Sequence, residues 1–277
     1  MNPLYLDIET IPCQAPAFRE EIAKPFNDAC SYKVDELRQE IEQLKPPANY
    51  KDPAKIEAWK VDELPKKRAA LEAQMKAQAT ERDTKIEDAW RKTSFDGALC
   101  QIVVIGSARG DDKPLTLHSK PEEVLTLAGE ARLLRAWFSA LELVPESERM
   151  QFTWVGHNVL DFDLRIIFQR AVIHGIRPPL WIPFDSKPWG DRVFDTMLAW
   201  AGTRGRVGLD KLCRVLGIDA KGSELGDEID GSKVWDFVKD GRIKDVATYC
   251  AGDVNRAREA HRRLTFWQPE RGLKVVA

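Results

Sequence analysis

The chain opens with alternating apolar and acidic positions. Residues 4–10 read Leu-Tyr-Leu-Asp-Ile-Glu-Thr, a pattern that predicts a β-strand. Successive side chains on a strand point to opposite faces, so Asp7 and Glu9 share one face while Leu6 and Ile8 share the other. Neighbouring carboxylates repel each other, and a divalent cation with hard oxygen ligands relieves that repulsion. An acid pair at a strand end is also often solvated, so the pair alone leaves both interpretations open.

Strand and helix patterns continue after residue 100. The run at 101–106, Gln-Ile-Val-Val-Ile-Gly, is apolar and β-branched, which is typical of a central strand. Segments 193–200 and 209–217 have a helical or partly extended pattern. Further strands are predicted at 114–118 and 151–155, and helices at 130–143, 161–174, 232–238 and 243–264. This order predicts an α/β fold, a mixed sheet flanked by helices, with one domain over residues 1–265 and a tail at 266–277.

Residues 33–92 differ in character from the rest of the chain. They are glycine-free and rich in charged residues, and apolar residues recur at helical spacing. Breaks are expected at Pro46-Pro47 and Pro65, and Asp52-Pro53 is typical of a helix start. We expect two or three helices forming an antiparallel hairpin inserted after the first strand. Its nearly balanced charge suits a solvated hairpin, whereas the basic cluster at 66–68 favours an arm that binds a partner or guides nucleic acid.

Bulk composition excludes some classes of protein. The 277 residues are 43% hydrophobic with a net charge of -2, so any site for a polyanion must be a local patch. No apolar run reaches the about 18 residues that span a membrane, and no signal-peptide pattern begins the chain. The five cysteines are scattered and lack a Cys-x-x-Cys pair, which argues against a disulfide framework and a zinc site. We therefore expect a cytoplasmic protein with no membrane partner.

Two later stretches supply further acids. Residues 158–165 follow a predicted strand and open a helix, and they contain Asp161 and Asp163. Tyr249 and Asp253 lie four residues apart in the last predicted helix and therefore share a face. Each has an ordinary alternative. Asp161 or Asp163 is suited to capping a helix, Tyr249 to the core, and Asp253 to solvent.

Three motifs occur in the chain order of a known family: Asp7-x-Glu9, Asn158-x-x-x-Phe162-Asp163 and Tyr249-x-x-x-Asp253. They resemble the motifs of the DnaQ-like, or DEDD, 3′→5′ exonucleases. The most similar branch is the predicted exonuclease group related to the proofreading domain of family B DNA polymerases. The resemblance covers about residues 3–18 and 97–264 and implies an RNase H-like fold. Because the family places an aromatic residue directly before its second-motif ligand, the resemblance selects Asp163 and leaves Asp161 as a cap. Tyr249, with Thr248 before it, resembles the third motif of the tyrosine branch.

The resemblance implies a metal-dependent 3′→5′ exonuclease that releases nucleoside 5′-monophosphates from single-stranded DNA. Two Mg²⁺ or Mn²⁺ ions would be held by four carboxylates, those of Asp7, Glu9, Asp163 and Asp253. Tyr249 would position the attacking water, since a phenol with a pKa of about 10 is a poor base. The terminal nucleotide is expected to contact Thr10, Asn158 and Phe162. Basic residues suited to the strand form two groups, Arg204, Arg206, Lys211 and Arg214, and Arg256, Arg258, Arg262 and Arg263.

Alternative functions remain at this stage. An exoribonuclease would use the same chemistry, and no motif distinguishes ribose from deoxyribose. A non-catalytic nucleic-acid or partner-binding module on the same fold is a different class. The complete set of acids argues against such a module. Clustered carboxylates repel one another, and a binding module has no function that requires them. The helical segment is the expected contact for a protein partner, and this role is compatible with catalysis.

Overall fold

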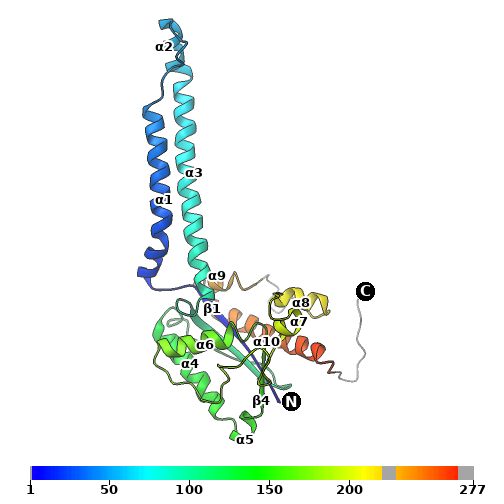
Figure 1. The fold of residues 1–277 in the computed structure, drawn as a ribbon. Helices are drawn as coiled ribbons and strands as arrows, with labels where there is room; N and C mark the ends of the chain where they lie inside the picture. Colours follow the sequence, from blue (N-terminus) through cyan, green and yellow to red (C-terminus); the bar gives the residue numbers. More distant parts are fainter. Residues whose placement is uncertain (1, 220–228, 268–277) are drawn as a thin grey trace. The chain divides into compact units, whose positions relative to one another are not determined.

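The computed structural model describes residues 2–219 and 229–267 (Figure 1). The chain divides into two compact units, one formed by Met1–Gln14 and Thr93–Ala277 and the other by Ala15–Lys92. The second unit is helical and interrupts the first in sequence. It begins at Ala15 rather than at the expected residue 33. The predicted tail at 266–277 lies, past Trp267, outside the described residues.

The first unit contains a five-stranded mixed sheet in the order β3-β2-β1-β4-β5. Its strands are β1 (Asn2–Ile11), β2 (Gln101–Arg109), β3 (Leu115–His118), β4 (Phe152–Gly156) and β5 (Val193–Asp195). Strands β1, β2 and β3 pair antiparallel, whereas β4 runs parallel to β1 and to β5. The first predicted strand is therefore the central one, and near its start it pairs with β2 on one edge and with β4 on the other.

Helices cover both faces of this sheet. On one face Leu4, Leu6 and Ile8 pack with α4 (Leu127–Glu142) and α6 (Asp163–Ile173). On the other face a second core cluster joins β2 to α9 (Val234–Lys239) and α10 (Ile243–Leu264). The alternation read in residues 4–10 thus separates an apolar face from the face that carries Asp7 and Glu9. This mixed sheet between helical layers is an RNase H-like α/β fold, as the sequence predicts.

Shorter helices complete the first unit. They are α5 (Glu146–Arg149), α7 (Thr196–Ala201), α8 (Leu209–Val215) and the 3-10 turn η1 (Lys92–Phe95), which follows the helical unit. The predicted bounds of the last helix, 243–264, are those of α10. Gly217 follows α8 with a φ of 63°, the left-handed conformation expected of a glycine after a helix. No helix among the described residues has the length and apolarity needed to cross a membrane.

The helical unit consists of α1 (Pro16–Glu42), α2 (Pro53–Asp62) and α3 (Leu64–Arg91). Helices α1 and α3 lie side by side (Figure 1). Helix α1 begins well before residue 33, where the sequence predicts the helical segment to start, and it continues through Pro25. Packing along α3 outweighs the backbone hydrogen bond that proline removes. Asp52 caps α2 as predicted, accepting a hydrogen bond from the Ala54 amide at 3.0 Å.

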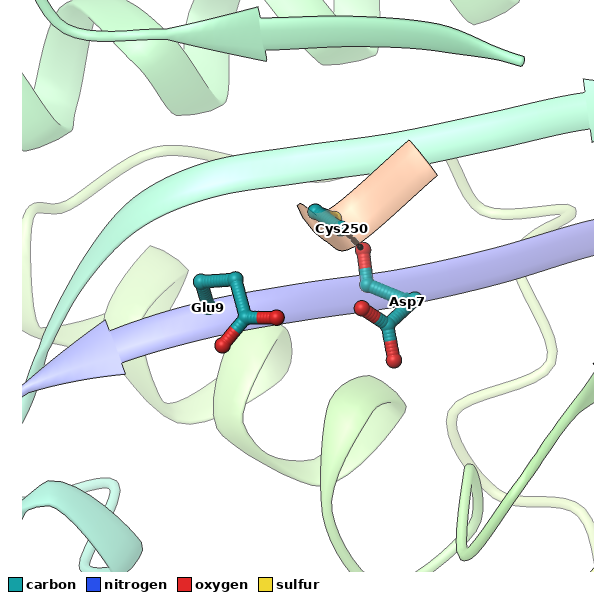
Figure 2. A group of neighbouring side chains, drawn as sticks. All are labelled: Asp7, Glu9 and Cys250. Atoms are coloured by element: carbon teal, nitrogen blue, oxygen red, sulfur yellow. Dashed lines mark hydrogen bonds between the residues drawn. The ribbon is translucent and has the colours of Figure 1, made fainter. Parts of the chain in front are cut away.

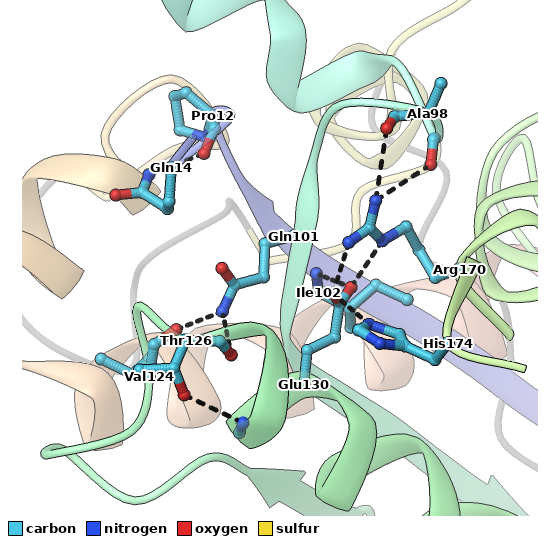
Figure 3. A network of polar contacts seen from close by, with 12 residues as sticks. Pro12, Gln14, Ala98, Gln101, Ile102, Val124, Thr126, Glu130, Arg170 and His174 are labelled. Atoms are coloured by element: carbon cyan, nitrogen blue, oxygen red, sulfur yellow. Dashed lines mark hydrogen bonds and ion pairs between the residues drawn. The ribbon is translucent and has the colours of Figure 1, made fainter. Parts of the chain in front are cut away.

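A buried ion pair fixes α6 against the sheet (Figure 3). Glu130 on α4 is fully buried and binds Arg170 on α6 through two hydrogen bonds of 2.9 and 2.6 Å. The Glu130 carboxylate also accepts the Ile102 amide at 2.8 Å and bonds His174 Nε2 at 2.7 Å. Burial alone would raise the pKa of Glu130, but the hydrogen bonds from His174 and Arg170 and the arginine charge hold it below its usual value. This network sets the position of α6, whose first residue is Asp163.

Candidate active site

Asp7 and Glu9 project from the same face of β1 (Figure 2). Glu9 is 7% exposed and Asp7 is half-buried. Cys250 on α10 lies beside them, and its thiol donates a hydrogen bond to the Asp7 backbone carbonyl at 3.5 Å. One ligand atom from each of these three residues lies within 4.8 Å of the others. Helix α10 therefore covers the acid pair of β1, and the two carboxylates are not simply solvated at a strand end.

The close approach of α10 depends on Gly106. This residue on β2 is paired with Asp7 across the antiparallel ladder. A Cβ atom at Gly106 would lie 2.8 Å from Cys250 Sγ and 3.1 Å from Val254 Cγ2, closer than real Cβ atoms normally come. The absence of a side chain on β2 lets α10 pack directly over the acid pair.

Asp163 reaches β1 at the point where β4 has ended. The β1–β4 pairing runs only from Asn2–Phe152 to Tyr5–Val155, so the Ile8 amide has no strand partner on that edge. Asp163 Oδ1 accepts a hydrogen bond from this amide at 2.9 Å, and the residue is 2% exposed. Burial, followed by the nearby charge of Asp7, raises the pKa of Asp163 well above its usual value. The second-motif acid thus belongs to the same cluster as the first-motif acids.

Asp161 lies outside this cluster. Its side chain is 63% exposed and forms a 3.3 Å ion pair with Arg206. The residue before α6 is Phe162, and no side-chain hydrogen bond caps the helix, so the predicted capping role of Asp161 is wrong. Of the two acids, only Asp163 lies against β1.

Helix α10 brings Tyr249 close to the acid pair and carries Asp253 one turn further on. Both are buried, at 1% and 3% exposure, so the alternative of a solvated Asp253 is wrong. Burial, followed by the charges of Asp253, Glu9 and Asp7, raises the pKa of Tyr249 above its usual value. Its hydroxyl therefore keeps its proton near neutral pH and can only donate or accept a hydrogen bond. Asp253 forms a buried 3.2 Å ion pair with Arg256.

The three residues expected to contact the terminal nucleotide lie around this cluster. The Thr10 hydroxyl donates to the Ser94 carbonyl at 2.8 Å, which leaves the lone pairs of its oxygen as acceptors. Asn158 has a φ of 63°, and its buried Oδ1 has no hydrogen-bond partner among the described residues. Phe162 is half-buried, and its ring centroid lies 6.2 Å from that of Phe95.

Two residues near the second motif are structural. His157 contacts the Thr196 hydroxyl at 3.0 Å, and its Nε2 donates to the Val207 carbonyl at 2.7 Å. Asp195 caps α7 and accepts the Asn158 amide at 3.0 Å, which fixes the turn before α6.

The arginines of α10 are largely committed within the protein. Arg256 binds Asp253, Arg258 donates to the Asp112 carbonyl at 2.6 Å, and Arg262 forms ion pairs with Asp111 and Glu259. Arg258 is also 8% exposed. These three are therefore positioned for packing around α10, in contrast to the expectation that they form a surface for the strand.

Comparison with known proteins identifies the family. The sequence model described as "Predicted 3'-5' exonuclease related to the exonuclease domain of PolB" matches residues 95–257, more than half of the chain. The chain belongs to this family. The match contains Asp163, Tyr249 and Asp253, whereas Asp7 and Glu9 precede it, separated by the helical unit. No curated protein and no solved structure matched the chain.

The donor set of this domain suits a hard divalent cation. The carboxylates of Asp7 and Glu9 lie close enough to share an ion, and Asp163 is drawn to the same strand by the Ile8 amide. These carboxylates supply oxygen donors, which favour Mg²⁺ or Mn²⁺, whereas the Cys250 thiol beside them donates a hydrogen bond to the Asp7 carbonyl. Burial and, after it, the charge of Asp7 raise the pKa of Asp163, and a bound cation would lower it again. The residues present therefore fit a divalent metal site.

Sequence reasoning missed Cys250 and Phe95. Cys250 follows Tyr249 directly, but its contact with Asp7 depends on Gly106, which lies far away in sequence. Phe95 is 66% exposed at the end of η1, beside Phe162. The only sequence signal for Phe95 was its position directly after the charged helical segment.

Proposed function

We propose that this chain is a metal-dependent 3′→5′ exonuclease that acts on single-stranded DNA ends and releases nucleoside 5′-monophosphates. One observation carries the proposal. The acids of β1 and α6 meet on the stretch of β1 from Asp7 to Glu9, and Tyr249 of α10 lies within reach of the charges of Asp7, Glu9 and Asp253. Membership of the exonuclease family supports the direction of cleavage.

In this proposal Asp7, Glu9, Asp163 and Asp253 hold two Mg²⁺ or Mn²⁺ ions. Such ions lower the pKa of an attacking water and neutralise charge on the phosphate that is cleaved. The chain's own contribution is to hold the carboxylates rigidly. The Ile8 amide orients Asp163, and the Gly106 contact sets the distance of α10 from Asp7.

Tyr249 has a positioning role in this site. Its raised pKa keeps the hydroxyl protonated, so it cannot remove a proton from water near neutral pH. It can donate a hydrogen bond to an oxygen atom beside Asp253 and Glu9. This proposed role is the one expected for the tyrosine branch of the DEDD exonucleases, which the third motif resembles.

An end-labelled degradation assay tests the proposal. Single-stranded DNA, duplex DNA and RNA carrying a 5′ label are incubated with Mg²⁺, Mn²⁺ or chelator. The wild type is compared with Asp7→Ala and with Asp210→Ala, which changes an exposed acid paired with Arg214. We expect a metal-dependent ladder shortening from the 3′ end of single-stranded DNA, retained in Asp210→Ala and lost in Asp7→Ala. Preferred degradation of RNA would replace the DNA assignment. Folded protein that cleaves no substrate would favour a binding module.

A further inference from the structure

One face of α6 is exposed and leads away from the acid cluster. Phe162, Arg165 and Phe168 are spaced three residues apart and therefore lie on neighbouring turns of one side. Arg165 is exposed and Phe168 is 38% exposed, whereas Leu164 and Ile167 on the opposite side are buried. Phe168 is five residues from Asp163, about 8 Å along the helix axis.

This face ends in an open cavity of about 340 Å³. It is lined by Arg165, Phe168, Phe184, Asp185, Ser186 and Lys187. The rings of Phe168 and Phe184 are 5.5 Å apart between centroids and tilted by 48°. Arg165 and Lys187 form no ion pair within residues 2–219 and 229–267. Two cations without a carboxylate partner therefore flank an aromatic pair, with Asp185 as the acid on the lining.

A second aromatic pair stands at the other end of the same face. Phe95 is 66% exposed, and its ring lies 6.2 Å from that of Phe162, the residue before Asp163. The hydrogen bond from Thr10 to Ser94 ties the segment next to Phe95 to β1. Aromatic rings and cations therefore alternate from the acid cluster to the cavity.

We propose that these six residues, Phe95, Phe162, Arg165, Phe168, Phe184 and Lys187, form a track that binds single-stranded nucleic acid upstream of the cleaved nucleotide. This inference rests on the proposed function, since the acid cluster is taken as the place where the 3′ end is cleaved. Bases stack on the aromatic rings, and phosphates contact the two cations. Aromatic stacking tolerates every base, so the track binds without sequence preference. The mixture of unpaired cations and exposed rings favours a single strand over an apolar protein segment.

Substitutions along the track should weaken binding in a length-dependent way. Phe168→Ala removes one ring of the cavity and should reduce affinity for a long strand about 5- to 160-fold, the range for stacking of one base. Arg165→Gln and Lys187→Gln should each lower the dependence of log affinity on log salt concentration by about 0.7 for a lost phosphate contact. The losses should be larger for a long strand than for a dinucleotide.

The test is equilibrium binding measured by fluorescence anisotropy in Ca²⁺, with 5′-labelled thymidine oligonucleotides. A dinucleotide is compared with a strand of about ten nucleotides. Arg135→Gln and Leu143→Ala serve as controls, because both residues are exposed and lie outside the track. Urea unfolding of each variant verifies that it is folded. Degradation of the same oligonucleotides in Mg²⁺ is measured in parallel.

Length-dependent loss in the three track variants, with both controls at wild-type affinity, supports the track. If the wild type binds in this way but cleaves nothing, the proposed function fails while the track stands. If the wild type cleaves and the track variants match the controls for both strand lengths, the track is overturned. Absence of any binding and cleavage by the wild type overturns both.

Discussion

Asp163 accepts a hydrogen bond from the backbone amide of Ile8 at 2.9 Å, which joins the start of α6 to the strand carrying Asp7 and Glu9. The bond exists because β4 ends before it can pair with this part of β1. A carboxylate therefore takes the place of a neighbouring strand in the ladder. The same feature of the sheet that exposes the amide also brings a third acid to the first two.

The Gly106→Ala variant should damage the site through packing alone. Its new methyl group would meet Cys250 Sγ and Val254 Cγ2, so α10 must move away from β1. We expect a loss of about 1–3 kcal/mol in the free energy of unfolding and reduced nuclease activity. Urea unfolding and degradation rates measure the two effects. In the double variant with Cys250→Ala the combined loss should be smaller than the sum of the single losses; additive losses would contradict this contact.

The Tyr249→Phe variant should separate positioning from folding. Removing the hydroxyl should lower kcat by roughly 10²-fold, because a hydrogen bond aimed at the reacting group is lost. The free energy of unfolding should change by only about 1 kcal/mol, since the ring still fills the core. Steady-state kinetics and urea unfolding test this pair of results. An unchanged kcat would restrict Tyr249 to a core role.

The Glu130 network should make the sheet domain sensitive to acid. The pKa of Glu130 is held below its usual value of 4.5 in the folded protein, so the unfolded chain takes up the proton first as the pH falls. The contribution of this group is complete above pH 4.5 and is lost as the pH falls below it. Glu130→Gln should lose about 3–5 kcal/mol near neutral pH, because Arg170 remains buried without its partner.

Urea unfolding between neutral and acidic pH measures this effect. The matched control is Glu123→Gln, which breaks a partly exposed ion pair with Arg132. That loss should stay below about 1 kcal/mol. Equal losses in the two variants would show that the buried network does not stabilise the domain more than a surface pair.

The helical unit should be removable. The Cys13 amide donates to the Thr93 hydroxyl at 2.9 Å. The two segments of the first unit that flank the helical insertion are therefore already in contact. Replacing Ala15–Lys92 with a short Gly/Ser linker should leave a folded domain that still degrades single-stranded DNA, and would abolish binding of any partner that docks on the helices. Circular dichroism and the degradation assay test the first point. A folded but inactive variant would place part of the substrate contact in the helical unit.

Local patterns predicted much of the sheet domain. Alternation in residues 4–10 indicated that Asp7 and Glu9 share a face, and helical periodicity gave the bounds of α10. These features depend on neighbouring residues and so can be read from sequence. The resemblance to a known family, not periodicity, separated Asp163 from Asp161. The catalytic roles of these residues remain predictions.

Other features depend on contacts between distant segments. The helix α1 continues through Pro25 because α3 packs beside it, and local rules for proline predict a break. The contact of Cys250 with Asp7 requires a glycine on β2, and the Glu130–Arg170 pair joins helices 40 residues apart. The local sequence of α10 does not predict that Cys250 contacts Asp7, and the local sequence of α4 does not predict that Glu130 pairs with Arg170.

The central claim is that Asp163, and not its neighbour Asp161, completes a catalytic cluster with the acids of β1. The most direct test measures degradation of 5′-labelled single-stranded DNA in Mg²⁺ by Asp163→Asn and Asp161→Asn. The two substitutions are identical in chemistry and two residues apart, but only Asp163 is buried against β1. We predict loss of cleavage in Asp163→Asn and wild-type rates in Asp161→Asn. Full activity in a folded Asp163→Asn variant would contradict the proposed site.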